Sequence, residues 1–426
     1  LALHTTSFDE QPLSDKSLSR FRRRCYDYEK THGVDLYHDC VTGLAEATAR
    51  MMGIDKRIRR MDSLMVEANI RKLSRMELIY TCISKLIRYL HKNGHDDMIG
   101  HMEHYYDPND FNRVIYHSRS TDADKRIGVL LKDADLLLEK CGNDFEEITE
   151  YQLFVRCLSE QTIVEDGKRR LRTKEDGGMN SSILQNPSDP DATYRKKAGK
   201  EHRGYAANVE ESVGKNGSVV TDYQLDSNNK SDSEFFQEHV EKIGPQEEKT
   251  IISADGAYSG EENTELAAKN NIDLVTTDLT GRDVDPVMGA FELNEDGTRV
   301  LHCPAGNAPR SNWYNKATGI INISFERDKC ANCPFAMHCK PKIFKKVSKL
   351  TVSRKMVNRA LTQARMNTEQ FKLLARIRNG VETVPSALKN IYNVNHMPVR
   401  GKIPCKYFFG SKIAALNFRK LLRFRQ

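Results

Sequence analysis

Apolar residues recur at helical spacing near the start of the chain. Within 14–52, the residues Leu18, Phe21, Cys25 and Tyr28 lie three or four positions apart. That spacing places side chains on one face of an α-helix, so we expect this stretch to be helical.

A strand and a second helix are predicted next. The apolar run at 61–66 has the length of a buried strand. Ser74 and Glu77 have the spacing of a capping box, in which each side chain bonds the other residue's backbone at a helix start. The stretch 93–165 is predicted to be mainly helical and polar. The apolar stripe of the helix after Ser74 consists of Ile79, Cys82, Ile83, Leu86, Ile87 and Leu90.

The middle of the chain predicts an α/β core. The stretch 166–200 is rich in Gly, Asp, Asn and Lys without periodicity, which is typical of a linker. The stretches 204–213 and 217–225 predict a hairpin. Strands are predicted at 250–255 and 272–276, with a capped helix between them. Such a strand–helix–strand unit is typical of an α/β fold.

Composition describes a charge-rich protein without a membrane segment. The chain has 426 residues, enough for two or three domains, and 29% of them are charged. No apolar run approaches the roughly 20 residues that a membrane helix needs, and no secretory signal begins the chain. The ten cysteines are dispersed, which is typical of reduced thiols in a cytosol. The first residue is Leu1, so we expect that a further segment preceded it.

Positive charge is unevenly distributed. The net charge is +7, but 340–355 holds seven Lys and Arg without an acid, and 383–426 holds nine without an acid. Smaller Arg clusters lie at 20–24 and 57–60. Any one cluster is explained by a solvated face; several together favour a polyanion partner.

Asp255 is the first candidate for chemistry. It ends a predicted parallel strand and precedes a small-residue turn and a capped helix. Sites in α/β sheets lie at the carboxyl ends of the strands, so this position suits a functional carboxylate. The structural alternative is a turn-forming Asp that caps backbone amides.

A second candidate is Glu382, which stands between Arg378 and Lys389. It is four residues from Arg378 and seven from Lys389, so on one continuous helix the three side chains share a face. The structural alternative is a surface ladder of ion pairs. In a basic, acid-poor region an isolated carboxylate also suits a metal ligand.

Together these motifs resemble bacterial insertion-sequence transposases of the DDE class. The spacing at 378–389 is similar to that family's Tyr-x-x-Arg-x-x-x-Glu-x-x-x-x-x-x-Lys signature. The stretches 254–263 and 60–69 resemble the segments around its second and first acids. Asp-Pro-Asp-Ala at 189–192 and Arg-Gly at 400–401 also resemble the family. The resemblance covers nearly the whole chain, and the order of the motifs makes it fairly specific.

The resemblance implies Mg²⁺-dependent cleavage and transfer of DNA strands at element ends, through two ions that Mn²⁺ can replace. It also implies double-stranded DNA as end and target, a homodimer on DNA, and a bacterial cytoplasm as the location. The implied catalytic and magnesium-binding residues are Asp62, Asp255 and Glu382, and the implied DNA-binding residues are Arg378, Lys389, Arg400, Lys402 and Lys406.

The chain departs from the family pattern in three places. Ala375 stands where the signature has Tyr, and Pro385 should kink or end the helix after Glu382. About 140 residues separate Asp62 from the predicted hairpin, which requires a helical insertion after the first strand. Without such an insertion, Asp191 or Asp222 would be the first acid.

The expected fold is α/β, with a ribonuclease-H-like mixed sheet flanked by helices. The expected segments are an N-terminal helical DNA-binding region at 1–60, a first core strand at 61–72, a helical insertion at 73–165, a linker at 166–200, the core at 201–284, a Cys-cluster insertion at 285–350, and a C-terminal catalytic helix with a basic tail at 351–426.

Four cysteines form a candidate zinc site. Cys330 and Cys333 have Cys-x-x-Cys spacing, Cys339 follows closely, and Cys303 precedes them. Four thiolates complete a tetrahedral structural zinc site, and His338 or His302 could replace one of them. The alternative is a set of ordinary reduced thiols.

Trp313, the only tryptophan, lies in the same insertion, within Arg-Ser-Asn-Trp-Tyr-Asn. We expect it in the core of a small domain; the alternative is an aromatic surface that stacks on an unpaired base.

The sequence therefore favours an active transposase. Two other functions use the same residues or fold: a catalytically inactive DNA-binding protein derived from a transposase, and a metal-dependent nuclease that hydrolyses strands without joining them.

Overall fold

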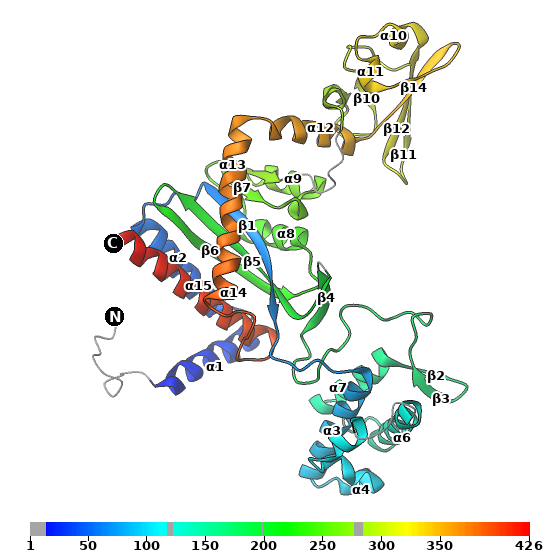
Figure 1. Ribbon diagram of the computed structural model, residues 1–426, viewed down its shortest axis with the longest axis vertical. Coiled ribbons are helices and arrows are strands. Elements are labelled where there is room, and N and C mark those ends of the chain that lie inside the picture. Colours follow the sequence, from blue (N-terminus) through cyan, green and yellow to red (C-terminus); the bar gives the residue numbers. More distant parts are fainter. Residues whose placement is uncertain (1–13, 117–121, 198, 277–283) are drawn as a thin grey trace.

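The computed structural model describes residues 14–116, 122–197, 199–276 and 284–426 (Figure 1). A mixed sheet at its centre confirms the predicted α/β fold. In space its strands follow the order β6-β5-β1-β7-β8, with β4 paired to the start of β5. The strands are β1 (Ile58–Glu67), β4 (Thr193–Lys197), β5 (Lys200–Gly214), β6 (Gly217–Ser227), β7 (Thr250–Ala254) and β8 (Ile272–Thr276).

Strand directions in this sheet are mixed as expected. The central strand β1 runs parallel to β7, and β7 runs parallel to β8. On its other side β1 pairs with β5 antiparallel, and β5 forms the predicted hairpin with β6. Apart from the short strand β4, the sheet thus has three antiparallel strands, β1, β5 and β6, followed in sequence by the parallel strands β7 and β8, which is the ribonuclease-H-like arrangement.

Alternation along β1 directs its side chains to two helical layers. Leu64 and Val66 pack with one layer, and Met61 and Met65 pack with the other. The first layer contains α2 (Leu36–Met51), α13 (Glu369–Asn379), α14 (Thr383–Asn390) and α15 (Lys402–Arg425), and α1 (Asp15–His32) lies against α2 and α15. The second contains α8 (Asp232–Ile243) and α9 (Glu261–Lys269). Figure 1 shows α13 and α14 crossing the sheet.

A separate helical body is inserted between β1 and β5 (Figure 1). Ser74 and Glu77 form the capping box that starts it, and Leu184 packs into its core. The stretch for which the sequence suggests a linker therefore contains β3, β4 and a buried leucine. The elements of this body are α3 (Arg75–Lys92), α4 (Asp96–Ile99), η2 (Gly100–Tyr106), α5 (Asp110–Ile115), α6 (Ala123–Cys141), α7 (Thr149–Gln161), β2 (Thr162–Glu165) and β3 (Lys168–Leu171).

A second insertion follows β8 and contains a four-stranded sheet of order β11-β12-β14-β13. It rejoins the core through α12, and Figure 1 shows it at the far end of that helix from the central sheet. Its elements are η5 (Pro286–Ala290), β9 (Glu292–Leu293), β10 (Val300–His302), β11 (Ser311–Asn315), β12 (Ile320–Glu326), α10 (Arg327–Ala331), α11 (Ala336–Cys339), β13 (Lys342–Ile343), β14 (Val347–Val352) and α12 (Arg354–Met366).

None of the described helices combines the length and apolar character that crossing a membrane requires.

Candidate active site

Two of the predicted acids lie on neighbouring strands. Asp62 is in β1, and Asp255 directly follows β7, where it begins the short helix η4 (Gly256–Tyr258). In the parallel pairing of these strands, Arg60 is opposite Ser253. Continuing that register by two residues brings Asp62 beside Asp255. The β1 and β7 positions therefore form a carboxylate pair from two distant parts of the sequence.

Asp62 is in an unfavourable place for a charged carboxylate. Burial raises its pKa to about 6, and the negative charge of Asp255 acts in the same direction. A hydrogen bond from the Ser63 backbone N–H and the positive charge of Arg378 oppose that shift without cancelling it. Burial is thus the main reason why the neutral carboxyl is favoured, and a cation bound beside Asp62 would favour the charged form instead.

Arg378 reaches the carboxylate pair from α13. Its Nη2 atom lies 3.4 Å from Oδ2 of Asp255. Its Nε atom is buried and has no hydrogen-bond partner within the part of the chain that the structure describes. A buried donor without an acceptor is costly, so this atom has capacity for an oxygen of a bound ligand.

A buried polar network fixes the turn after β7. The hydroxyl of Tyr258 donates to Oδ1 of Asn208 at 2.8 Å, and the Asn208 amide donates to Gln224 at 2.7 Å. Asn208 is also the cross-strand neighbour of Ser63. These bonds link β5, β6 and η4 directly beside the acids. Sequence reasoning missed this network, because its members are single polar residues in unrelated segments.

Arg60 connects the acid-bearing strand to the C-terminal helices. It lies two residues before Asp62, on the same face of β1. Its Nε donates to Glu211 at 2.6 Å, and its Nη1 donates to the backbone carbonyl of Ile377 at 2.6 Å. A Cβ atom at Gly380 would clash with this Nη1, so the guanidinium occupies space that a side chain there would need. The contact holds the end of α13 over β1.

Glu382 ends a short 3-10 turn between two α-helices. The helix α13 ends at Asn379, and η6 (Gly380–Glu382) joins it directly to α14. Gly380 and Glu382 keep right-handed helical backbone angles, but the tighter turn changes the helical spacing between Arg378, Glu382 and Lys389. Pro385 lies in the first turn of α14, where a missing N–H is tolerated. The change from α-helix to a 3-10 turn therefore comes before the proline, beside Arg60, and η6 packs against β1.

The Glu382 side chain is exposed. Among the described residues, no group of three or more Asp, Glu, His and Cys side chains is arranged to hold a metal ion. The structure thus brings Asp62 and Asp255 together, with Glu382 on an adjoining segment outside a formed ligand set.

The two alternative first acids are engaged elsewhere. Asp222 is on β6, with β5 between it and β1, and accepts a 2.6 Å contact from Nε2 of His38. His239 lies on its other side; burial alone would lower the pKa of His239, but Glu210 and Asp222 raise it to about 9. Asp191 accepts the backbone N–H of Lys402. The structure pairs neither Asp191 nor Asp222 with Asp255.

The basic C-terminal residues have partners inside the chain. Nζ of Lys402 contacts Asp226 at 2.6 Å, and Nζ of Lys406 contacts Glu29 at 2.6 Å and Asp35 at 2.7 Å. Arg400 donates to the backbone carbonyl of Asn69. These cations sit at or near the start of α15, whose apolar residues are core. The buried apolar residues of α15 include Cys405, Phe409, Ile413 and Leu416.

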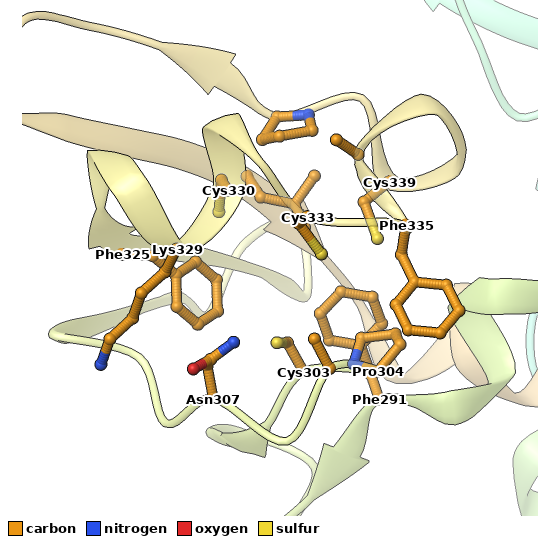
Figure 2. Close-up of a pocket in the computed structure, with 14 residues that line it drawn as sticks. Phe291, Cys303, Pro304, Asn307, Phe325, Lys329, Cys330, Cys333, Phe335 and Cys339 are labelled. Atoms are coloured by element: carbon orange, nitrogen blue, oxygen red, sulfur yellow. The ribbon is translucent and has the colours of Figure 1, made fainter.

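The four cysteines of the insertion line one small cavity of about 20 Å³ (Figure 2). Cys303 follows β10, Cys330 is in α10, Cys333 lies between α10 and α11, and Cys339 ends α11. Burial and the adjacent thiols raise the pKa of Cys339 to about 11. The fold therefore gathers all four sulfurs, although their arrangement is not that of a formed metal site.

Comparisons with known proteins give one family match to part of the chain and one distant structural likeness. Residues 302–422, less than a third of the chain, match a family described as "Transposase DDE domain". This segment contains Glu382 and the cysteine cluster, and lies outside β1 and β7. No curated protein matches the chain. A cryo-EM structure of a piggyBac transposase synaptic complex with hairpin DNA aligns at 10% identity and a TM-score of 0.24, covering 91% of this chain and 77% of that one.

Proposed function

We propose that this protein is a transposase that cleaves DNA and transfers its strands at insertion-sequence ends, with Asp62, Asp255 and Glu382 as catalytic carboxylates. The family match at 302–422 supports the class of reaction. The observation that carries the proposal is the pairing of Asp62 with Asp255 on adjacent strands, with Arg378 against them.

The three carboxylates would hold Mg²⁺, which Mn²⁺ could replace. Both are hard cations that prefer oxygen ligands, and binding either one would offset the cost of burying the charged Asp62 carboxylate. When bound, two such ions activate an attacking water or 3′ hydroxyl and stabilise the leaving oxygen. Glu382 would complete the ligand set from η6, whose backbone already lies against β1.

Other residues of the chain would position the DNA. The unpartnered Nε of Arg378 can donate to a phosphate oxygen near the cut, and Arg suits such contacts because its donors form a fork. Lys389, on α14, would contact a neighbouring phosphate as a point charge. The bound partners would be the element ends and the target duplex, and joining two ends would require a homodimer on DNA.

The cysteine cavity would hold one structural Zn²⁺. Four sulfur donors around one small cavity fit a soft, tetrahedral ligand set (Figure 2). A closed zinc site would stabilise an insertion whose apolar core is small. Elemental analysis of freshly reduced protein should find about one zinc per chain, lost in a Cys330→Ser/Cys333→Ser variant. Absence of zinc from the unaltered protein would contradict this assignment.

Cleavage can be tested with a supercoiled plasmid that carries the DNA flanking both sides of the coding sequence. With Mg²⁺, the protein should cut this DNA and join the released 3′ ends to a second duplex. Asp62→Asn, Asp255→Asn and Glu382→Gln should each lower product formation by about a thousandfold or more and leave DNA binding intact.

Asp191→Asn is the matched control, because Asp191 is the alternative first acid, and it should cleave normally. Hydrolysis without joined products would identify a nuclease on the same fold. Binding without cleavage, even with Mn²⁺, would identify a non-catalytic DNA-binding protein.

A further inference from the structure

The sheet of the second insertion has two chemically different faces. Along β12, Ile321, Ile323 and Phe325 are buried in the insertion core, next to the cysteines. Asn322 and Ser324 alternate with them and lie on the opposite face. One face of this sheet is therefore fully used for packing. The other, here called the outer face, has no covering layer in the described structure.

The outer face is a basic and aromatic hollow of about 650 Å³. Trp313 on β11 is 61% exposed and Phe344, beside β13, is 49% exposed. The expectation that Trp313 is a core residue is therefore wrong: its register on β11 opposite Asn322 puts it on the outer face. Its floor includes the edges of Ile323 and Leu350, which otherwise pack into the insertion core. The rest of the lining is polar or basic, and no acid belongs to it.

Two lysines on this face lie directly opposite each other. Lys342 on β13 pairs across strands with Lys349 on β14, and Lys349 in turn is opposite Ser324. Like charges facing each other across strands are destabilising without a counter-charge. Among the described residues neither lysine forms an ion pair, although Nζ of Lys349 lies 5.6 Å from the centre of the Phe344 ring. This arrangement suits a bound polyanion.

We propose that the outer face binds an unpaired DNA strand. Lys342 and Lys349 would contact its phosphates, and the exposed ring of Trp313 would stack on a base. Single-stranded nucleic acid is bound by this combination of a positive groove with aromatic platforms, because every base offers a flat π face. An apolar peptide would leave the paired lysines without counter-charges. A duplex would satisfy the lysines but would offer no unstacked base to the indole.

The position of the outer face separates this activity from cleavage. Figure 1 shows the insertion sheet beyond α12, away from β1 and α13. Bound DNA would therefore lie remote from Asp62 and Asp255. The proposal does not depend on the proposed catalysis, because a chain without strand cleavage could still bind a single strand here.

The single tryptophan makes the test direct, because fluorescence excited at 295 nm reports on Trp313 alone. The full chain, free of added Mg²⁺, is titrated with a 15-nucleotide oligo(dT) and with a duplex of the same length carrying no overhang. Binding is followed in parallel by anisotropy of a labelled strand. We expect oligo(dT) to quench the tryptophan at the concentrations at which anisotropy rises, and the duplex to leave its emission unchanged.

Variants locate the contact. Lys342→Gln/Lys349→Gln should weaken oligo(dT) binding at least tenfold and flatten its log–log salt dependence by about 1.4, near 0.7 for each lost phosphate contact on a single strand. Trp313→Ala should weaken binding by about 1–3 kcal/mol, roughly five- to 150-fold. Lys269→Gln, on the exposed end of α9, removes one lysine charge elsewhere on the surface as a control. It should change neither the oligo(dT) affinity nor its salt dependence.

Two results would overturn the proposal. One is oligo(dT) binding by anisotropy without a tryptophan response and with unchanged affinity in the lysine variant, which would place the strand elsewhere. The other is equal binding and equal quenching by the duplex, which would make the face a duplex contact. Circular dichroism of each variant must match the unaltered chain, and Lys349→Arg, which retains the charge, should keep most of the affinity.

Discussion

The two sheets of this protein use positive charge in opposite ways. Beside the central sheet, Arg60 and Lys420 both contact Glu211, which is fully buried between them. On the outer face of the insertion sheet, Lys342 and Lys349 point away from the core without an acidic partner among the described residues. The first set of cations stabilises the fold, and the second set is available to bind an anionic ligand.

This difference has a physical cause. A charge can be buried only when an opposite charge and hydrogen bonds compensate the loss of water. The cations around the central sheet meet carboxylates from distant segments, as Lys406 meets Glu29. The outer face is not covered by another layer, so its lysines stay hydrated. An acid-free stretch of sequence is therefore not enough to identify a nucleic-acid surface. What matters is whether carboxylates from other segments lie against its cations in the folded chain.

The largest expected effect concerns the buried ion pairs. Glu211→Gln leaves Arg60 buried without a counter-charge, so it should lower the free energy of unfolding by about 3–5 kcal/mol. Lys342→Ala, from the outer face, should change it by less than about 0.5 kcal/mol. Urea unfolding followed by far-UV circular dichroism measures both. Equal effects of the two substitutions would remove the distinction between structural and free cations.

Replacing Asp62 should change the free energy of unfolding in the opposite direction from replacing Glu211. Its pKa is about 6 in the folded chain and near 3.8 when unfolded, so folded protein binds the proton more tightly between these values. Stability from this group is therefore present below pH 4 and lost as pH rises through 6. In metal-free protein, Asp62→Asn should raise the free energy of unfolding by about 2–3 kcal/mol at pH 7.5. The gain should disappear near pH 3.5; a loss of stability at pH 7.5 would contradict the electrostatic account of the site.

The smallest expected effect is at the start of α15. Lys402→Ala/Lys406→Ala removes cations that Asp226 and Glu29 already neutralise. The slope of log DNA affinity against log salt concentration should therefore change by less than half a unit, whereas the loss of one phosphate contact would change it by roughly one unit. Filter binding across salt concentrations measures this slope. A flattening by about two units would mean that both lysines contact phosphates and leave their internal partners on DNA.

The sequence was sufficient to predict the central sheet and the positions of Asp62 and Asp255 on it. Strand length and turn residues located β7 and Asp255, and the resemblance located Asp62 in β1, across a helical insertion of the predicted kind. These features are local: a few neighbouring residues determine a strand, a cap or a turn.

The remaining features depend on contacts between distant segments. The 3-10 turn that contains Glu382 begins where the guanidinium of Arg60 contacts Gly380, more than 300 positions away in the chain. The partners of Lys406 lie in the first helices. Trp313 is exposed because its strand register assigns it to the outer face. No periodicity or spacing in the sequence predicts these contacts or this register.

The most direct test of the account is Mn²⁺ binding to metal-free protein, measured by electron paramagnetic resonance at pH 7.5. The pairing of Asp62 with Asp255 predicts that the unaltered chain binds Mn²⁺ and that Asp62→Asn or Asp255→Asn weakens this binding at least about tenfold, because the number of charged ligands sets the affinity. Asp191→Asn should bind like the unaltered chain, and affinity should fall as pH drops below 6. If Asp62→Asn and Asp255→Asn both titrate like the unaltered chain, the carboxylate pair is not a cation site and the central claim is wrong.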